Sequence, residues 1–274
     1  MADTDWVDLH SHLVPGVDDG ARTLDEALEG IERMWERGVT RIVTTPHLSA
    51  TMTTVPERLE SFLAPMDEAF GRLKEAVAER FPDLTLGRGH EIALDLPDPD
   101  LSDPRLRLDR GSVVLVEWPG LQCPPGTERV LEHLVESGVQ PLVAHPERYR
   151  GHERNVALVG RWRDAGAWLQ VNYGSLVGRY GPQARERALR LLERGWVDCL
   201  ASDFHARPHL RLYMRETREL FTELGFGEQW ALLAGENPGR ILDGEAPVPV
   251  APLQLSTGVL ERIRKVLGGF RARG

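Results

Sequence analysis

Cysteine and lysine are the residue types that this sequence has least of. The 274 residues include two cysteines, Cys123 and Cys199, which excludes a disulfide framework and makes the reducing cytoplasm the expected location. Lys74 and Lys265 are the only lysines, and neither ends a predicted strand. This scarcity removes lysine from the candidate metal ligands.

Long apolar runs are missing as well. A run such as Val113–Val116 is far too short to cross a membrane, and the acidic N-terminus has no apolar stretch of a signal peptide. The net charge of −9 disfavours nucleic acid as a partner, because nucleic-acid-binding proteins usually carry a basic surface. Phosphate substrates remain compatible with this charge, since bound metal ions can dominate the field of a site.

A recurring pattern organises the rest of the chain: a helical stretch ends at a glycine, and a short apolar strand follows. The pattern occurs at Gly38, Gly138, Gly166 and Gly195. Glycine tolerates the left-handed conformation that ends many helices. Helices that alternate with continuously apolar strands indicate a parallel sheet covered by helices. We therefore predict the α/β class, with a distorted (β/α)7 TIM-like barrel over residues 1–244.

Seven strands and six helices are expected in this barrel. The predicted strands are Trp6–His10, Arg41–Thr45, Leu84–Glu91, Val113–Trp118, Pro141–His145, Trp168–Asn172 and Asp198–Asp203. The predicted helices are Leu24–Arg37, Pro56–Arg80, Glu128–Ser137, Asn155–Ala165, Gln183–Arg194 and Leu210–Leu224.

The C-terminal end, residues 245–274, is predicted as a separate unit. Glu245–Pro252 is rich in proline, which is typical of a stiff, extended linker. Between Leu260 and Arg273, apolar residues at helical spacing lie beside basic ones, which predicts a short amphipathic helix. This helix either packs on the barrel or docks on an anionic membrane surface, a partner or a neighbouring subunit.

Histidine and acidic residues follow six of the seven predicted strands. His10 and His12 are two residues apart, so a strand places both side chains on the same face, together with Asp8. The remaining candidates at strand ends are His47, Glu91, Glu117, His145, Asp203 and His205. Barrel enzymes collect their active-site residues at the carboxyl ends of the strands. The pattern therefore predicts a metal centre at this end of the barrel.

The ligand types narrow the metal and the reaction. Imidazole and carboxylate without thiolate suit Mn²⁺, Fe²⁺ or Zn²⁺. The number of candidates exceeds what one tetrahedral ion needs, so two or three ions are expected. Sites with several metal ions activate water and stabilise the attacking and leaving oxygens of an in-line phosphoryl displacement. The sequence therefore favours a phosphate-ester hydrolase.

These motifs resemble the PHP (polymerase and histidinol phosphatase) superfamily. Within it, the chain is most similar to the bacterial PHP-type protein-tyrosine phosphatases of capsule and exopolysaccharide loci. Val17-Asp18-Asp19-Gly20 and Ala144-His145-Pro146-Glu147-Arg148-Tyr149 favour that family over other PHP proteins. The matching motifs run from residue 8 to about residue 242, and the proline-rich tail lies outside them.

The resemblance implies a PHP fold and a site that holds three metal ions, usually manganese, with iron and zinc as alternatives. It implies that His10, His12, Glu91, Glu117, His145 and Asp203 hold two ions, and that Asp19, His47 and His205 belong to the third. Arg148 and Arg207 would bind the substrate phosphate. The implied substrate is a phosphotyrosine protein, a bacterial tyrosine kinase that regulates polysaccharide synthesis. A metal-activated water would attack phosphorus, and the phenolate, with a parent pKa of about 10, would leave with little acid assistance.

A thiol mechanism is a competing hypothesis. Cys123, Gly126 and Arg129 match the C-x-x-G-x-x-R pattern of thiol-based tyrosine phosphatases. Such an enzyme needs backbone N–H groups around the phosphate, and Pro124 and Pro125 have none. The motif is therefore interpreted as an ordinary loop before a helix.

Three further alternatives differ in reaction or substrate. Amidohydrolases also begin with His-x-His on a first strand, but many of them bridge two metals with a modified lysine, and Lys74 and Lys265 are in the wrong places. A PHP phosphatase that acts on a small metabolite such as histidinol phosphate is a second alternative, and a comparison of substrates would distinguish it from a tyrosine phosphatase. A barrel that binds metal without catalysis would have lost ligands, and none of the expected ligands is missing.

Overall fold

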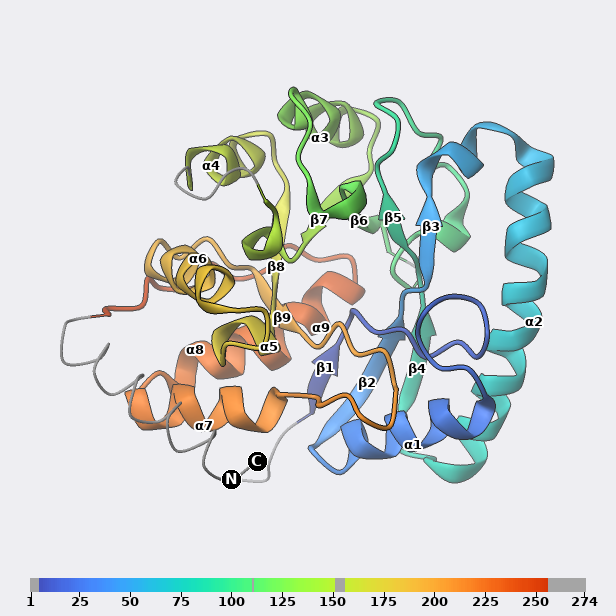
Figure 1. The fold of residues 1–274 in the computed structure, drawn as a ribbon, viewed down its shortest axis with the longest axis horizontal. Coiled ribbons are helices and arrows are strands. Elements are labelled where there is room, and N and C mark those ends of the chain that lie inside the picture. Colours follow the sequence, from blue (N-terminus) through green and yellow to red (C-terminus); the bar gives the residue numbers. More distant parts are fainter. Residues whose placement is uncertain (1–4, 110, 151–155, 256–274) are drawn as a thin grey trace.

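The computed structural model describes residues 5–109, 111–150 and 156–255 (Figure 1). Its strands form two parallel sheets. The first has the order β1 (Trp6–Asp8), β2 (Val39–Thr44), β4 (Thr85–Arg88). The second has the order β3 (His47–Ser49), β5 (Glu91–Ala93), β6 (Val113–Glu117), β7 (Gln140–Ala144), β8 (Trp168–Asn172), β9 (Cys199–Ala201). Among the described residues, no helix combines the length and the apolarity needed to cross a membrane.

The two sheets are parts of one seven-stranded barrel. Thr44 pairs with Arg88 and His47 pairs with Glu91, so the register of β2 and β4 continues unchanged into β3 and β5. The interruption coincides with Pro46, which has no N–H for the ladder. Beyond β1 and β9, the His12 N–H donates to the Phe204 carbonyl at 2.9 Å and closes the barrel. The predicted seven-stranded α/β barrel is confirmed, although Leu84–Glu91 is divided into β4 and β5.

Helices surround the strands, and six of them match the predicted ones. These are α1 (Leu24–Trp35), α2 (Pro56–Arg80), α3 (Thr127–Glu136), α4 (Val156–Asp164), α6 (Pro182–Glu193) and α7 (Met214–Leu224). Shorter elements were not predicted: α5 (Tyr173–Leu176), α8 (Gly227–Ala231), α9 (Asn237–Leu242), the π turn η5 (Leu232–Glu236), and the 3₁₀ turns η1 (Ala50–Thr54), η2 (Pro104–Leu106), η3 (Pro119–Leu121) and η4 (Pro146–Arg148). Gly38, Gly138, Gly166 and Gly195 all have positive φ, as their place at helix ends predicts.

The barrel interior changes from apolar to polar along each strand. Alternate residues of β6 are Val113 and Leu115, which belong to the buried core, and the next on the same face is Glu117. Cys199 and Ala201 of β9 lie in that core and precede Asp203 in the same way. Ile241 and Leu242 of α9 complete the cluster. The apolar layer thus supports the functional side chains at the carboxyl ends of the strands.

The proline-rich segment packs on the barrel as far as the structure describes it. Val250 and Leu253 belong to the buried core, and the Leu253 N–H donates to the Leu192 carbonyl at 3.0 Å. The Asn237 amide exchanges hydrogen bonds of 2.8 and 2.9 Å with the Val248 backbone. The division of the chain after residue 244 stays a prediction. The predicted basic helix lies outside the described residues.

Candidate metal centre

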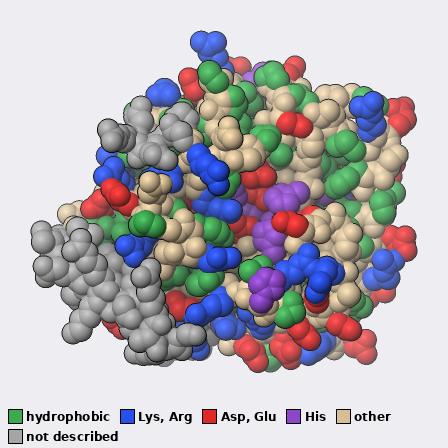
Figure 2. All heavy atoms as spheres, in the orientation of Figure 1, with side chains coloured by type: hydrophobic (Ala, Val, Ile, Leu, Met, Phe, Trp, Pro, Cys, Tyr) green, Lys and Arg blue, Asp and Glu red, His purple; other side chains and the backbone are tan. Residues whose placement is uncertain are grey.

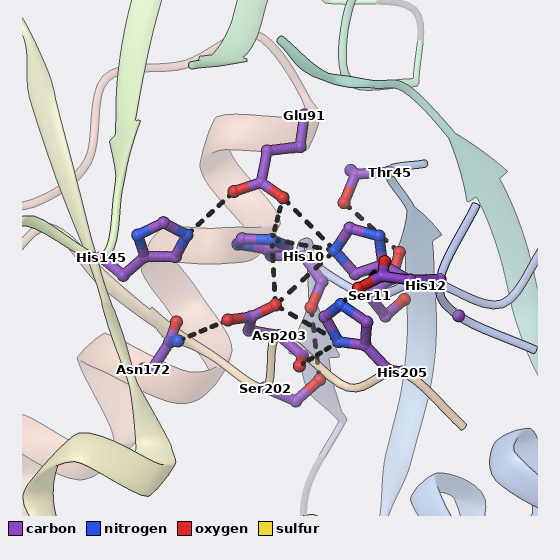
Figure 3. Close-up of polar contacts among 12 residues, drawn as sticks. His10, Ser11, His12, Thr45, Glu91, His145, Asn172, Ser202, Asp203 and His205 are labelled. Carbon is purple, nitrogen blue, oxygen red and sulfur yellow. Dashed lines mark hydrogen bonds and ion pairs between the residues drawn. The ribbon is translucent and has the colours of Figure 1, made fainter. Parts of the chain in front are cut away.

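The predicted ligands converge at the carboxyl ends of the strands, and Figure 3 shows six of them: His10, His12, Glu91, His145, Asp203 and His205. Their ligand atoms form three groups, each within 4.8 Å: His10, His12, Glu91 and Asp203; His12, Asp19, His47 and His205; and His47, Glu91 and Glu117. His145 joins them because its Nε2 lies 2.9 Å from Glu91 Oε1. On the surface, histidine and acidic side chains gather at the centre of one face, with arginines beside them (Figure 2). The barrel therefore brings together every residue that was proposed as a metal ligand.

The two histidines after β1 are oriented by partners on their outer nitrogens. His10 Nδ1 lies 2.9 Å from Gln170 Oε1, and His12 Nδ1 lies 2.7 Å from Asp18 Oδ2. Both oxygens only accept, so each Nδ1 carries a proton when the ring is neutral and each Nε2 presents a lone pair. The two Nε2 atoms face each other at 3.4 Å. Such converging lone pairs fit a bound cation, and a partner on the other ring nitrogen is typical of metal-bound histidine.

Glu91 lies at the junction of the groups. Its Oε2 is buried without a hydrogen bond and lies 3.2 Å from His10 Nε2, 3.3 Å from His12 Nε2 and 3.2 Å from His47 Nδ1. A buried carboxylate oxygen without a hydrogen bond is costly unless something else satisfies it. The donor set of imidazoles and carboxylates therefore fits metal ions, with Glu91 shared between groups.

The acids of the centre strongly affect one another's charge. Burial and the neighbouring Glu91 carboxylate raise the pKa of Glu117 to about 8. Burial opposes ionisation of Glu91 too, but the charge of His10 and the hydrogen bond between His145 Nε2 and Glu91 Oε1 hold the pKa of Glu91 well below the usual range. Like charges this close disfavour full ionisation of both carboxylates. Bound cations would relieve this repulsion.

Two ligand positions have unusual backbone conformations. His145 has a φ of 37° and Asp203 a φ of 50°, the left-handed region that non-glycine residues rarely adopt. Each such residue costs roughly 1–3 kcal/mol and persists only where its surroundings hold it. The Asp203 N–H donates to the His10 carbonyl at 2.9 Å. Asp8 accepts from the backbone N–H groups of His10 and Ser202.

The two proposed phosphate-binding arginines have different surroundings. Arg148, in η4 after β7, places Nη1 2.5 Å from Asp203 Oδ2, and its guanidinium lies 4.2 Å from the Tyr180 ring centroid. Arg207 donates to the Asp19 carbonyl at 3.1 and 3.3 Å and lies 3.7 Å from a Glu26 oxygen. Arg148 is therefore part of the metal centre, whereas Arg207 is attached to the loop that carries Asp19.

Sequence reasoning assigned no role to several residues that support the ligands. Asp18 orients His12 and also accepts from the His47 N–H at 3.2 Å. Gln170 orients His10, and Asn172 donates to Asp203 Oδ2 at 2.8 Å. Gln170 and Asn172 alternate on β8, the one predicted strand without a candidate ligand. The spacing of these two polar residues, which places both on the interior face of a predicted barrel strand, was the signal in the sequence that could have identified them.

Gly20 provides a direct test of the loop that carries Asp18 and Asp19. A Cβ atom on Gly20 would lie 2.2 Å from the His12 carbonyl oxygen and 2.5 Å from His12 Cβ. Gly20→Ala is therefore expected to displace the loop, lower metal content and reduce the predicted hydrolase activity by roughly 10-fold or more, as loss of ligand support does elsewhere.

Gly71→Ala is the matched control, because nothing lies within 4 Å of its added Cβ. It lies within α2, where alanine is favoured over glycine by about 0.5–1 kcal/mol, so it should melt slightly higher with normal activity. Unchanged metal content and activity in Gly20→Ala would show that the loop does not support the centre.

The cysteine motif does not provide a second reaction centre. Burial raises the pKa of the Cys123 thiol to about 12, so the thiolate that a nucleophile requires is scarce at neutral pH. Gly126 has positive φ and precedes α3 without a side-chain cap. The motif is the loop before a helix that the sequence analysis favoured.

The sequence of this chain is similar to a family model and to named proteins. The family model described as "Capsular polysaccharide synthesis, CpsB/CapC" matches residues 6–243. The tyrosine-protein phosphatase YwqE of Bacillus subtilis is 28% identical over 238 residues, 86% of this chain and 91% of that protein. The tyrosine-protein phosphatase CpsB of Streptococcus pneumoniae is 28% identical over 250 residues, 86% of this chain and 98% of that protein.

Solved structures agree with these matches. A structure described as one of YwqE from B. subtilis and CpsB from S. pneumoniae, "unique metal-dependent tyrosine phosphatases", superposes with a TM-score of 0.73 at 25% identity, covering 90% of this chain and 99% of that one. An amidohydrolase from Mycoplasma synoviae, at 13% identity and a TM-score of 0.52, shares only the fold. The sequence match and the barrel together show that this chain belongs to the CpsB/CapC family of capsular polysaccharide synthesis.

Proposed function

We propose that this chain is a metal-dependent protein-tyrosine phosphatase, a phosphoric monoester hydrolase. The observation that carries the proposal is the convergence of imidazoles and carboxylates around Glu91, with the Arg148 guanidinium beside Asp203. The names of the relatives YwqE and CpsB support the substrate class. Its protein substrate would be a bacterial tyrosine kinase that regulates polysaccharide synthesis, and it would act in the cytoplasm.

The proposed metal is manganese, with up to three ions per site. His10, His12, Glu91, Glu117, His145 and Asp203 would hold two of them, and Asp19, His47 and His205 the third. Bound metal would supply Lewis acidity and an activated water.

The protein's own groups would position the phosphate and neutralise its charge. Arg148 presents a planar set of donors that suits phosphate oxygens, and its stacking on Tyr180 holds the plane in place. Asn172 keeps Asp203 oriented by a hydrogen bond of 2.8 Å. Arg207 stays a proposed second phosphate ligand. A phenolate leaving group, with a parent pKa of about 10, needs little protonation, which favours phosphotyrosine over phosphoserine.

The proposal is tested by metal analysis combined with a substrate panel. The purified protein should contain metal and hydrolyse p-nitrophenyl phosphate and a phosphotyrosine peptide. A chelator should abolish both activities, and Mn²⁺ should restore them better than Zn²⁺ or Fe²⁺. Equal kcat/KM on matched phosphoserine and phosphotyrosine peptides, or strong preference for histidinol phosphate, would contradict the tyrosine phosphatase assignment. Full activity after complete metal removal would contradict the metal dependence.

A further inference from the structure

A cavity of about 320 Å³ adjoins the metal centre. Its lining includes Arg148, Arg150, Arg187, Tyr180 and the first turn of α6. Arg148 connects the two sites, since it is paired with Asp203 and packed on the Tyr180 ring. Arg148 is therefore within reach of both the metal centre and a ligand in this cavity.

Among the residues that the structure describes, the charged groups that line the cavity are all positive. Its described lining residues include three arginines and no acidic residue, in a protein with a net charge of −9. Guanidinium groups that share a cavity repel one another, and an anion between them relieves the repulsion while it accepts charge-assisted hydrogen bonds. The cavity is therefore suited to an anionic ligand.

Arg148 and Arg150, which flank Tyr149 in the sequence, both line the cavity. Tyr149, between them, has an extended conformation and a buried ring whose hydroxyl accepts from the Trp118 N–H at 3.1 Å. Arg148 ends the 3₁₀ turn η4 and Arg150 follows the extended Tyr149, and the cavity is lined by both arginines. The Arg148 side chain is only 21% exposed, whereas Arg150 is an exposed residue. The pair thus runs from the metal centre toward the solvent.

The three arginines differ in how they are held. Arg148 is paired with Asp203, and Arg187 donates to the Tyr149 carbonyl. Arg150 has no carboxylate partner among the residues that the structure describes.

The spacing of an extended peptide decides which substrate residue can reach Arg150. Consecutive residues of such a peptide lie about 3.3 Å apart along its axis. A residue one to three positions from a bound phosphotyrosine can thus reach Arg150.

We infer that this cavity is a subsite for an acidic side chain, a carboxylate or a second phosphate, that flanks the scissile phosphotyrosine in the protein substrate. The inference rests on the proposed function and adds a sequence preference to it. Arg150 is a specificity residue in this role, because it contacts the flanking residue and lies outside the group that binds the scissile phosphate.

The test compares two phosphotyrosine peptides that differ only in glutamate or glutamine at the flanking positions. The unmodified enzyme should show a roughly 10-fold higher kcat/KM on the glutamate peptide, mostly through KM, and high salt should reduce the difference. Arg150→Gln should remove the preference and leave hydrolysis of p-nitrophenyl phosphate unchanged. Arg150→Glu should favour the glutamine peptide.

Arg129→Gln is the control for the loss of one positive charge, since Arg129 is exposed on α3 and does not line the cavity. It should keep the full preference. Equal kcat/KM on the two peptides in the unmodified enzyme, or an undiminished preference in Arg150→Gln, would overturn the subsite while the tyrosine phosphatase assignment stands. Failure to hydrolyse either peptide would overturn both.

Discussion

Asp203→Asn is expected to reduce phosphatase turnover by roughly 10³-fold or more, because the change removes a ligand charge from the centre that would activate water and stabilise the transition state. Asp203 shares a group with His10, His12 and Glu91, and it also accepts from Arg148 and Asn172. Metal content, kcat on p-nitrophenyl phosphate and the far-UV spectrum should be measured together. His10→Ala should give the same loss.

Cys123→Ser is the matched comparison, because it removes the nucleophile of the competing thiol hypothesis. Serine should preserve near-normal turnover and metal content, since Cys123 is not a ligand in any group of the described centre. Loss of activity in Cys123→Ser with metal content intact would overturn the metal mechanism. Retained activity in a folded, metal-depleted Asp203→Asn protein would do so as well.

Arg148→Ala should lower kcat/KM by at least about 10-fold, which corresponds to about 1.4 kcal/mol of transition-state stabilisation. The guanidinium lies at the boundary of the metal centre and the arginine-lined cavity, where its donors can reach phosphate oxygens. Arg148→Lys should recover only part of the loss, because an ammonium group cannot bind two phosphate oxygens in one plane.

The melting temperature and metal content separate this role from a structural one. Both should change little in Arg148→Ala, and Arg129→Ala should leave kcat/KM unaffected. An unchanged kcat/KM in Arg148→Ala would refute the assignment to phosphate binding. A large fall in metal content would assign Arg148 to support of Asp203 instead.

The features that local sequence determines were predicted well. The end of a helix at a glycine such as Gly138 can be predicted locally, because it depends on the φ angle of that one residue. A continuous apolar run such as Val113–Val116 can likewise be recognised as a buried strand without knowledge of its partners. The predicted ligand set, whose residues the barrel brings together, followed from the same local rule. His10, Glu117 and Asp203 each lie where a parallel strand ends, and parallel strands of a barrel end on one face.

The tertiary structure alone decided which side chains meet across the barrel. The pairs Gln170–His10 and Asp18–His12 join residues on different strands or loops, so they depend on barrel closure and strand register. Arg207, between β9 and α7, lies against the Asp19 loop, 188 residues away in the sequence. Contacts of this kind depend on how the whole chain packs, and no local spacing specifies them.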